Sequence, residues 1–167
     1  MVTKFYQALI WQFCRRYVED KMGKIVTAIT HNTLEISKAL KFCHSEDCGA
    51  EILFIGTVRN TNEGRRVSGV NYDGHITLGE KILRELCQEA QLKWGNDLNF
   101  WVEHRLGLLN LGEASLLINV TSPHRDAAYM ASRYVIEQIK LRLPVWKEEI
   151  YCEGDKEWLK GQALNQF

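Results

Sequence analysis

The 167-residue chain lacks the features that would place it at once among membrane, nucleic-acid-binding or disulfide-rich proteins. No apolar run approaches the ~18 residues that a membrane-spanning helix requires. The 21 basic and 21 acidic residues leave no net charge, so any bound anion must be held by a local cluster of basic side chains. The five cysteines are scattered and odd in number, which is typical of a reduced chain. These absences predict a globular protein of the cytoplasm.

Familiar catalytic and metal-binding motifs are also missing. The sequence has no glycine-rich phosphate loop, no nucleophile elbow and no Ser-His-Asp order. No cysteine lies in the two basic clusters described below, within residues 59–66 and 124–147, so a catalytic thiolate is not expected. Cys43, His44 and Cys48 offer three potential metal ligands, but no fourth ligand is evident. We therefore expect neither a metal site nor a cofactor.

The length favours a single domain, which we place at residues 24–167 and which is long enough to bury a core. Residues 1–23 are interpreted as an N-terminal extension. The alternative is an additional helix that packs on the surface. A secretory signal is not predicted, because Arg15 and Arg16 follow the apolar part of this segment instead of preceding it.

Apolar periodicity and turn signals predict an α+β fold with a largely antiparallel sheet and three main helices. Asn32 is the expected N-cap of the first helix, with Glu35 at the capping-box spacing, and Gly56 is the expected site of a bulge. LLNLG is expected to form a tight connection between two strands. The predicted strands cover residues 24–30, 49–59, 67–75, 99–107, 113–122 and 144–151, and the predicted helices cover 31–43, 78–94 and 122–143.

The start of the longest predicted helix carries an unusual pair of basic residues. Ser122 is the expected cap, and Pro123 fits the first helical position. His124 and Arg125 then lie in the first turn, where the helix dipole disfavours cations. A bound anion would reverse that penalty, because free backbone N–H groups and the basic side chains would converge on it. The alternative is that both side chains point to solvent or pair with Asp126.

The same helix is expected to have one basic face and one apolar face. Residues 124–147 hold five Arg or Lys residues against two acids, whereas a solvated face normally mixes the signs more evenly. Pro144 ends the helix and turns the chain, so that Lys147 is expected to return toward Lys140. A wedge of about 80° contains Arg125, Tyr129, Arg133, Ile136 and Lys140. The predicted core stripe opposite this wedge consists of Ala128, Ala131, Val135 and Ile139.

A second basic cluster follows the predicted strand 49–59. Arg59 ends that strand, and Arg65 and Arg66 are expected on a polar loop that could close over a ligand. The alternative is that these arginines only keep the surface soluble.

Two ordered blocks carry a family resemblance. The first is GAEILFIGTVRNTNEGRRVSGVNY, and the second is VEHRLGLLNLGEASLLINVTSPHRDAAYMASRYVIEQIKLRLPVWKEE. Together they resemble the large, catalytic subunit of molybdopterin synthase. The resemblance implies an α/β-hammerhead fold and a homodimer in which each large subunit binds a small ubiquitin-like sulfur-carrier subunit, giving a heterotetramer. The carrier's C-terminal Gly-Gly thiocarboxylate donates sulfur to cyclic pyranopterin monophosphate, and two transfers build the dithiolene of molybdopterin.

The resemblance also implies roles for individual residues. Lys140 is expected to hold the acyl and sulfur end of the carrier tail, and Lys147 to stabilise charge as the cyclic phosphate opens. Both reactants are anions, so a positive pocket is needed to bring them together. The implied catalytic residues are Lys140 and Lys147, and the implied substrate-binding residues are Arg59, His124, Arg125, Arg133 and Glu149.

Two positions depart from the family pattern. Tyr72-Asp73-Gly74-His75 replaces an acid-aromatic stretch, and a basic residue near the C-terminus has no clear counterpart, Lys160 being the nearest. The alternative function is a non-catalytic dimeric module that binds a phosphorylated pterin or a nucleotide through the same basic surface.

Overall fold

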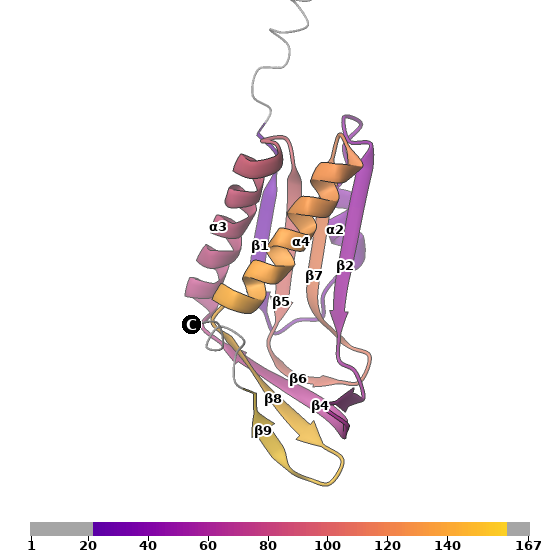
Figure 1. Ribbon diagram of the computed structural model, residues 1–167, viewed down its shortest axis with the longest axis vertical. Coiled ribbons are helices and arrows are strands. Elements are labelled where there is room, and N and C mark those ends of the chain that lie inside the picture. The colour runs from indigo at the N-terminus through magenta and orange to yellow at the C-terminus, as the bar shows by residue number, and fades with distance from the viewer. Residues whose placement is uncertain (1–21, 160–167) are drawn as a thin grey trace, which may run out of the picture.

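The computed structural model describes residues 22–159 and places twelve elements in them (Figure 1). The proposed N-terminal extension falls almost wholly in residues 1–21, outside the described part, and so does Lys160. No helix in the described part is long and apolar enough to cross a membrane. The elements are β1 (Ile25–Thr30), α2 (Ile36–Cys43), β2 (Ala50–Thr57), β3 (Thr61–Asn62), β4 (Arg65–Gly74), α3 (Ile76–Trp94), β5 (Asn99–Arg105), β6 (Gly107–Asn110), β7 (Ala114–Ser122), α4 (Arg125–Arg142), β8 (Val145–Tyr151) and β9 (Lys156–Trp158).

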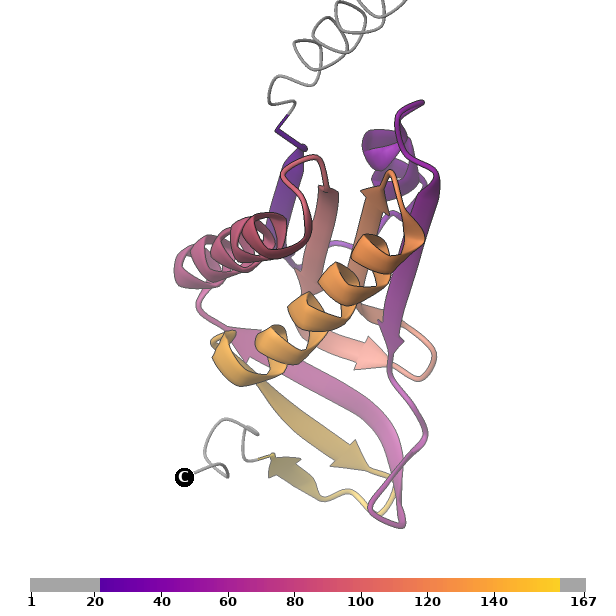
Figure 2. The same cartoon turned by 45° about the horizontal axis from the view of Figure 1, so that its top comes forward.

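The first sheet has the strand order β1-β5-β7-β2. Only the β1–β5 pair is parallel, and the other two pairs are antiparallel. Helices α3 and α4 cover one face of this sheet and α2 covers the other (Figures 1 and 2). The larger core lies under α3 and α4 and includes Leu83, Leu86, Phe100, Val102, Ile118, Val120, Ala131, Val135 and Ile139.

The second sheet lies beyond one end of the first (Figure 1) and has the order β3-β4-β8-β9. Strand β6 also pairs with β4, on the edge opposite β8. All pairings in this sheet are antiparallel. Its long strand β4 begins with Arg65 and Arg66 of the second basic cluster, and β8 follows α4 after the two residues Leu143 and Pro144. A small core of its own contains Val58, Val67, Val70, Leu109 and Tyr151.

The α+β prediction is confirmed, but the strands form two sheets rather than one. LLNLG is not only a tight connection, because Gly107–Asn110 leaves the β5–β7 pair and joins β4 as β6. Glycines with positive φ at Gly107 (92°) and Gly112 (81°) allow the chain to leave and to return, since a side chain is strained in that conformation. The bulge predicted at Gly56 is confirmed by a register shift between Gly56 and Thr57.

Two helix starts were predicted wrongly. Helix α2 begins after Glu35 rather than after Asn32, because the preceding segment runs extended and buries Leu34 against the sheet. Helix α4 has His124 as its N-cap, so Pro123 lies before the helix. The predicted cap Ser122 instead ends β7, where it pairs with a residue of β2. The predicted core stripe of α4, by contrast, is buried at Ala128, Ala131, Val135 and Ile139.

Candidate active site

Strand β8 presents three polar side chains on one face. Lys147, Glu149 and Tyr151 alternate along the strand, so all three point to the same side of the sheet. The Lys147 Nζ donates to Glu149 Oε1 at 2.6 Å, and the Tyr151 hydroxyl donates to Glu149 Oε2 at 2.9 Å. The Glu149 side chain is 1% exposed while that of Lys147 is 34% exposed. A buried carboxylate therefore holds a lysine whose amine still reaches the surface.

Asn62 joins this face to Arg59 of the second basic cluster. Its Nδ2 donates to Glu149 Oε2 at 3.0 Å, and its Oδ1 accepts from the Arg59 guanidinium at 2.7 Å. Asn62 occupies the last position of β3, before a two-residue turn in which Glu63 (φ 47°) and Gly64 (φ 82°) both have positive φ. That turn is the type I′ geometry that closes tight hairpins. The hairpin thus brings Arg59 and Lys147 into one hydrogen-bonded network.

The protein environment keeps the Glu149 carboxyl ionised. Burial acts to raise the pKa of this group, but the hydrogen bonds from Lys147, Tyr151 and Asn62, together with the charge of Lys147, outweigh burial and hold the pKa below its ordinary value. An ammonium has three N–H donors, so Lys147 keeps two for another acceptor after bonding Glu149.

The prediction that Arg65 and Arg66 lie on a polar loop is wrong, because both belong to β4. The Arg65 guanidinium stacks on the Tyr151 ring at 3.4 Å from the centroid. It also lies 3.3 Å from Asp155 and 3.2 Å from Glu157. Arg65 is therefore paired with acids of the β8–β9 hairpin and packs against the Tyr151 ring. The neighbouring Arg66 is exposed.

Lys140 lies in the last turn of α4, before a two-residue corner that leads to β8. Its side chain is 52% exposed, and its Nζ is 3.8 Å from Glu137 one turn earlier. A pair this exposed and this long contributes little to stability and leaves the amine available to a ligand. Lys140 and Lys147 thus flank the corner formed by Leu143 and Pro144.

The corner is fixed by the segment that departs from the family pattern. The His75 backbone N–H donates to the Pro144 carbonyl at 3.1 Å, and the His75 ring caps α3 by accepting from Leu78 N–H at 3.2 Å. A Cβ on Gly74 would lie 2.9 Å from the Pro144 carbonyl oxygen. The close approach of β4 to the corner thus depends on glycine at position 74.

The last turn of α4 is also tied to α3. Arg142 donates to both oxygens of Glu89, at 3.0 and 2.8 Å, and the Tyr134 hydroxyl donates to the same carboxylate at 2.5 Å. These hydrogen bonds lower the pKa of the Glu89 carboxyl, and the bond from Arg142 has the largest effect. The end of the helix that carries Lys140 is therefore held against its neighbour.

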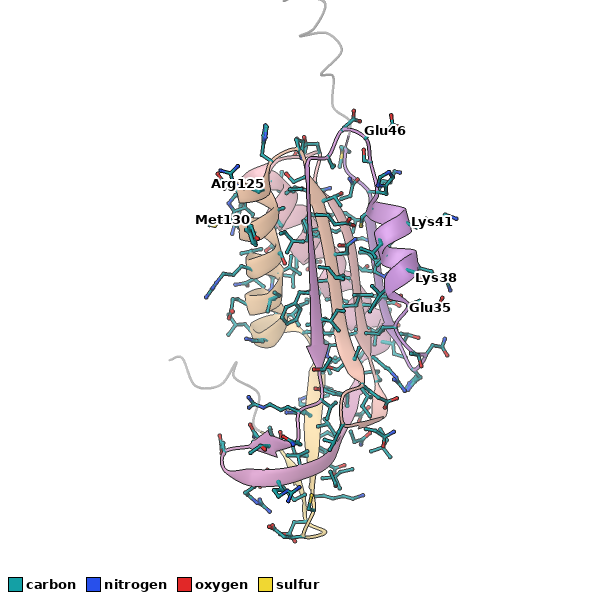
Figure 3. The ribbon with its side chains drawn as sticks, turned by 90° about the vertical axis from the view of Figure 1, so that its right-hand side faces the viewer. Glu35, Lys38, Lys41, Glu46, Arg125 and Met130 are labelled. Carbon is teal, nitrogen blue, oxygen red and sulfur yellow. The ribbon has the colours of Figure 1, made fainter. Side chains whose placement is uncertain are left out.

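His124 and Arg125 are not brought to this network within one chain. Arg125 begins α4 at the end of the molecule away from the second sheet (Figure 3), and about 22 Å of helix separates it from Lys140. Its guanidinium lies 3.7 Å from Asp126, and both side chains are more than four-fifths exposed. This matches the alternative interpretation of the pair for the isolated chain. Arg133 is exposed midway along the predicted wedge.

The cysteine–histidine group has no metal-site geometry. Among residues 22–159 no cluster of three or more His, Cys, Asp or Glu side chains could hold a metal ion. Cys43 is buried, its thiol donates to the Asn119 carbonyl, and burial raises its pKa to about 12. Cys48 Sγ accepts from Asn99 at 3.6 Å.

Two residues of the network, Asn62 and Tyr151, were not predicted. Tyr151 had a signal in the sequence, since period-two alternation through VWKEEIY places it on the face of Lys147 and Glu149. Asn62 looked like a turn residue, and nothing local to it indicates a partner 87 positions later.

Comparisons with known proteins agree on one family. The model of the MoaE protein family matches residues 29–142. The molybdopterin synthase catalytic subunit of Synechococcus elongatus is 44% identical over 133 residues, covering 80% of this chain and 81% of that protein. The human subunit of the same name is 38% identical over 137 residues, covering 82% and 72%. The crystal structure of molybdopterin synthase from Staphylococcus aureus superposes with a TM-score of 0.75 at 33% identity, covering 80% of this chain and 96% of that one. A complex of subunits 1 and 2 of molybdopterin-converting factor from Helicobacter pylori shares the fold, with a TM-score of 0.66 at 20% identity, covering 82% and 92%.

Proposed function

This chain belongs to the MoaE family, and we propose that it is the catalytic subunit of a molybdopterin synthase, an enzyme of molybdenum cofactor biosynthesis. It transfers sulfur from the thiocarboxylate of a small carrier subunit to cyclic pyranopterin monophosphate. The observation that carries this proposal is the Arg59–Asn62–Glu149–Lys147 network. It joins two basic residues that lie far apart in the sequence, and Lys147 follows the corner that Lys140 precedes.

Electrostatics explains why the site is cationic. The cyclic phosphate and the thiocarboxylate are both anions and repel each other when they approach in water. Arg59 and Lys147 carry two positive charges and Glu149 one negative charge, so the network is cationic. In this proposal Lys140, which precedes the corner, contributes a further positive charge. A pre-arranged set of donors stabilises charge that develops during reaction, because it does not have to reorganise.

Each residue has a distinct role in this proposal. Lys140, exposed and weakly paired, binds the acyl and sulfur end of the carrier tail. Lys147 stabilises the charge released when the cyclic phosphate opens, using the two donors that Glu149 leaves free. Arg59 binds the phosphate or the polar edge of the pterin. Glu149 is too buried to touch a substrate directly, so it acts by holding Lys147 in place.

His124, Arg125 and Arg133 serve the site of a second copy in this proposal. A rigid helix keeps the N-terminal end of α4 about 22 Å from Lys140 in the same chain. A homodimer that places this exposed basic end against the second sheet of its partner would supply the remaining anion ligands. Each site then contains residues of two protomers.

The partner is a ubiquitin-like carrier whose C-terminal Gly-Gly thiocarboxylate reaches Lys140, and we place the complex in the cytoplasm. The described cysteines, Cys43, Cys48, Cys87 and Cys152, are all free, which fits a reducing compartment.

Reconstitution tests the proposal. The purified chain is mixed with thiocarboxylated carrier and cyclic pyranopterin monophosphate, and molybdopterin is quantified. We expect product from the wild type and a loss of at least about 100-fold for Lys140→Ala, with Lys147→Ala less affected. The control Lys41→Ala changes an exposed lysine of α2, on the face of the first sheet opposite α4 (Figure 3), and should leave the yield unchanged. Tight pterin binding without turnover would instead indicate the non-catalytic module.

A further inference from the structure

Asn62 makes two hydrogen bonds of opposite sense across the candidate site. Its carbonyl oxygen accepts from Arg59 at 2.7 Å, while its amide nitrogen donates to Glu149 at 3.0 Å. We propose that Asn62 is a positioning residue of the sulfur-transfer site, which sets the guanidinium of Arg59 and, through Glu149, the ammonium of Lys147 relative to each other. This inference rests on the proposed function and assigns a role within it.

The two bonds require an amide at this position. Arg59 has only donors and the ionised Glu149 only acceptors, so the side chain between them must accept on one side and donate on the other. A carboxylate would satisfy Arg59 and repel Glu149, whereas an aliphatic side chain would satisfy neither. Asn62 lies on the β3–β4 hairpin, whose tight turn leaves its backbone little freedom to adjust.

Asn62 also supplies the one link in the network that crosses between sheet segments. Among the described residues, Glu149 accepts side-chain hydrogen bonds from Lys147 and Tyr151 of its own strand and from Asn62 of β3. Without the amide, β8 would still hold Lys147 on Glu149. The Arg59 guanidinium would then no longer be linked to that pair, and a displacement of about 1 Å can lower a rate about 100-fold.

The same sheet provides a matched control. Asn71 of β4 donates its Nδ2 to Glu148 Oε2 at 3.3 Å. Glu148 precedes Glu149 in β8 and therefore faces the opposite side of the sheet. Asn71→Asp and Asn62→Asp make the same chemical change, because each replaces an asparagine–glutamate hydrogen bond with two facing carboxylates. Only Asn62 belongs to the network.

The experiment measures kcat, KM for the pterin and the pH dependence of kcat in the reconstituted enzyme. For Asn62→Asp we expect a loss in kcat of about 10- to 100-fold, with a KM close to that of the wild type because the acceptor for Arg59 remains. The acid limb of the pH profile of kcat should move to higher pH, since a second carboxylate raises the pKa of Glu149. Lys147, Tyr151 and Arg59 act in the opposite direction and lower that pKa in both proteins. Asn71→Asp should leave all three quantities unchanged.

Comparing Asn62→Ala with Asn62→Asp separates the contributions of the two hydrogen bonds. The alanine variant also provides a test in case the charged variant does not fold. It loses the acceptor for Arg59 as well, so we expect KM to rise by about 10-fold in addition to the fall in kcat. The inference is overturned if Asn62→Ala keeps both kcat and KM, or if Asn71→Asp lowers kcat as much as Asn62→Asp. Absence of product from the wild type would refute the proposed function itself, and an active wild type with inactive Lys140→Ala upholds that function whatever Asn62 does.

Discussion

Replacing Glu149 with Gln removes one negative charge from a side chain that is 1% exposed and accepts hydrogen bonds from three donors. An amide offers one oxygen and one NH2 group in place of two equivalent oxygens. If the oxygen faces Asn62 and Tyr151, the NH2 group meets the Lys147 ammonium, and if it faces Lys147, the other two donors lose their acceptor. Either orientation leaves buried donors without a partner.

The free energy of unfolding should therefore fall by about 2–4 kcal/mol in Glu149→Gln. Breaking a fully buried ion pair costs about 3–5 kcal/mol, and hydrogen bonds to charged groups contribute about 1.5–3 kcal/mol each without being additive. The loss stays toward the lower part of this range because Lys147 is 34% exposed and can turn into water. With a urea m-value of about 2 kcal/mol/M, the midpoint of unfolding should fall by about 1–2 M.

The pH dependence separates charge from packing. The folded-state pKa of Glu149 is depressed, so its contribution is complete above the unfolded carboxyl pKa of about 4.3 and is lost as the pH falls through the folded value. The difference between wild type and Glu149→Gln should thus be largest near neutral pH and shrink in acid. The control Glu148→Gln, on the opposite face, should cost less than about 1 kcal/mol. A Glu149→Gln difference that is absent at neutral pH, or that persists unchanged in acid, would refute this reasoning.

Three further outcomes follow from the geometry. Gly74→Ala should lower stability by about 1–3 kcal/mol and reduce product formation, because the new Cβ presses on Pro144, and an unchanged melting temperature would contradict that contact. Burial lowers the pKa of His104 to about 4. The unfolded chain then takes up the proton first, so stability should fall by up to ~3 kcal/mol as the pH drops from about 6.5 to about 4, and an NMR titration with a pKa near 6.5 would show that the ring is accessible. In native protein, iodoacetamide should label the exposed Cys152 and spare the buried Cys43, as read by mass spectrometry, and equal labelling would show that α2 opens readily.

The apolar periodicity and the turn residues of the sequence predicted much of the fold. The 3.6-residue spacing of Ala128, Ala131, Val135 and Ile139 identified the buried side of α4, since that spacing depends only on the helix itself. The division into two sheets was not predicted. β6 has four residues, too few for alternation to be recognised, and its partner is set by the register of β4 rather than by anything local to LLNLG.

The site shows the same limit. The order of motifs indicated that Arg59 and Lys147 act together, and the structure joins them in one network, while the catalytic roles remain predictions. The link through Asn62 could not be predicted, because it depends on how β4 pairs with β8. Arg125 was grouped with Lys140 because the two share a helix face, and His124 because of the family resemblance. Two residues on one face of an 18-residue helix can still lie at its opposite ends.

Strand β8 lies near the C-terminal end of the chain, whereas its partner β4 and the Arg59–Asn62 segment lie in the N-terminal half and are synthesised first. During synthesis on the ribosome, the first sheet and its helices can assemble while the edge of β4 that receives β8 is still unpaired. A message that stops shortly after the codon for Pro144 would consequently encode a chain that keeps the main core and has no Lys147 at all. If Lys147 has its proposed role, such a chain is expected to transfer no sulfur even where its first sheet folds.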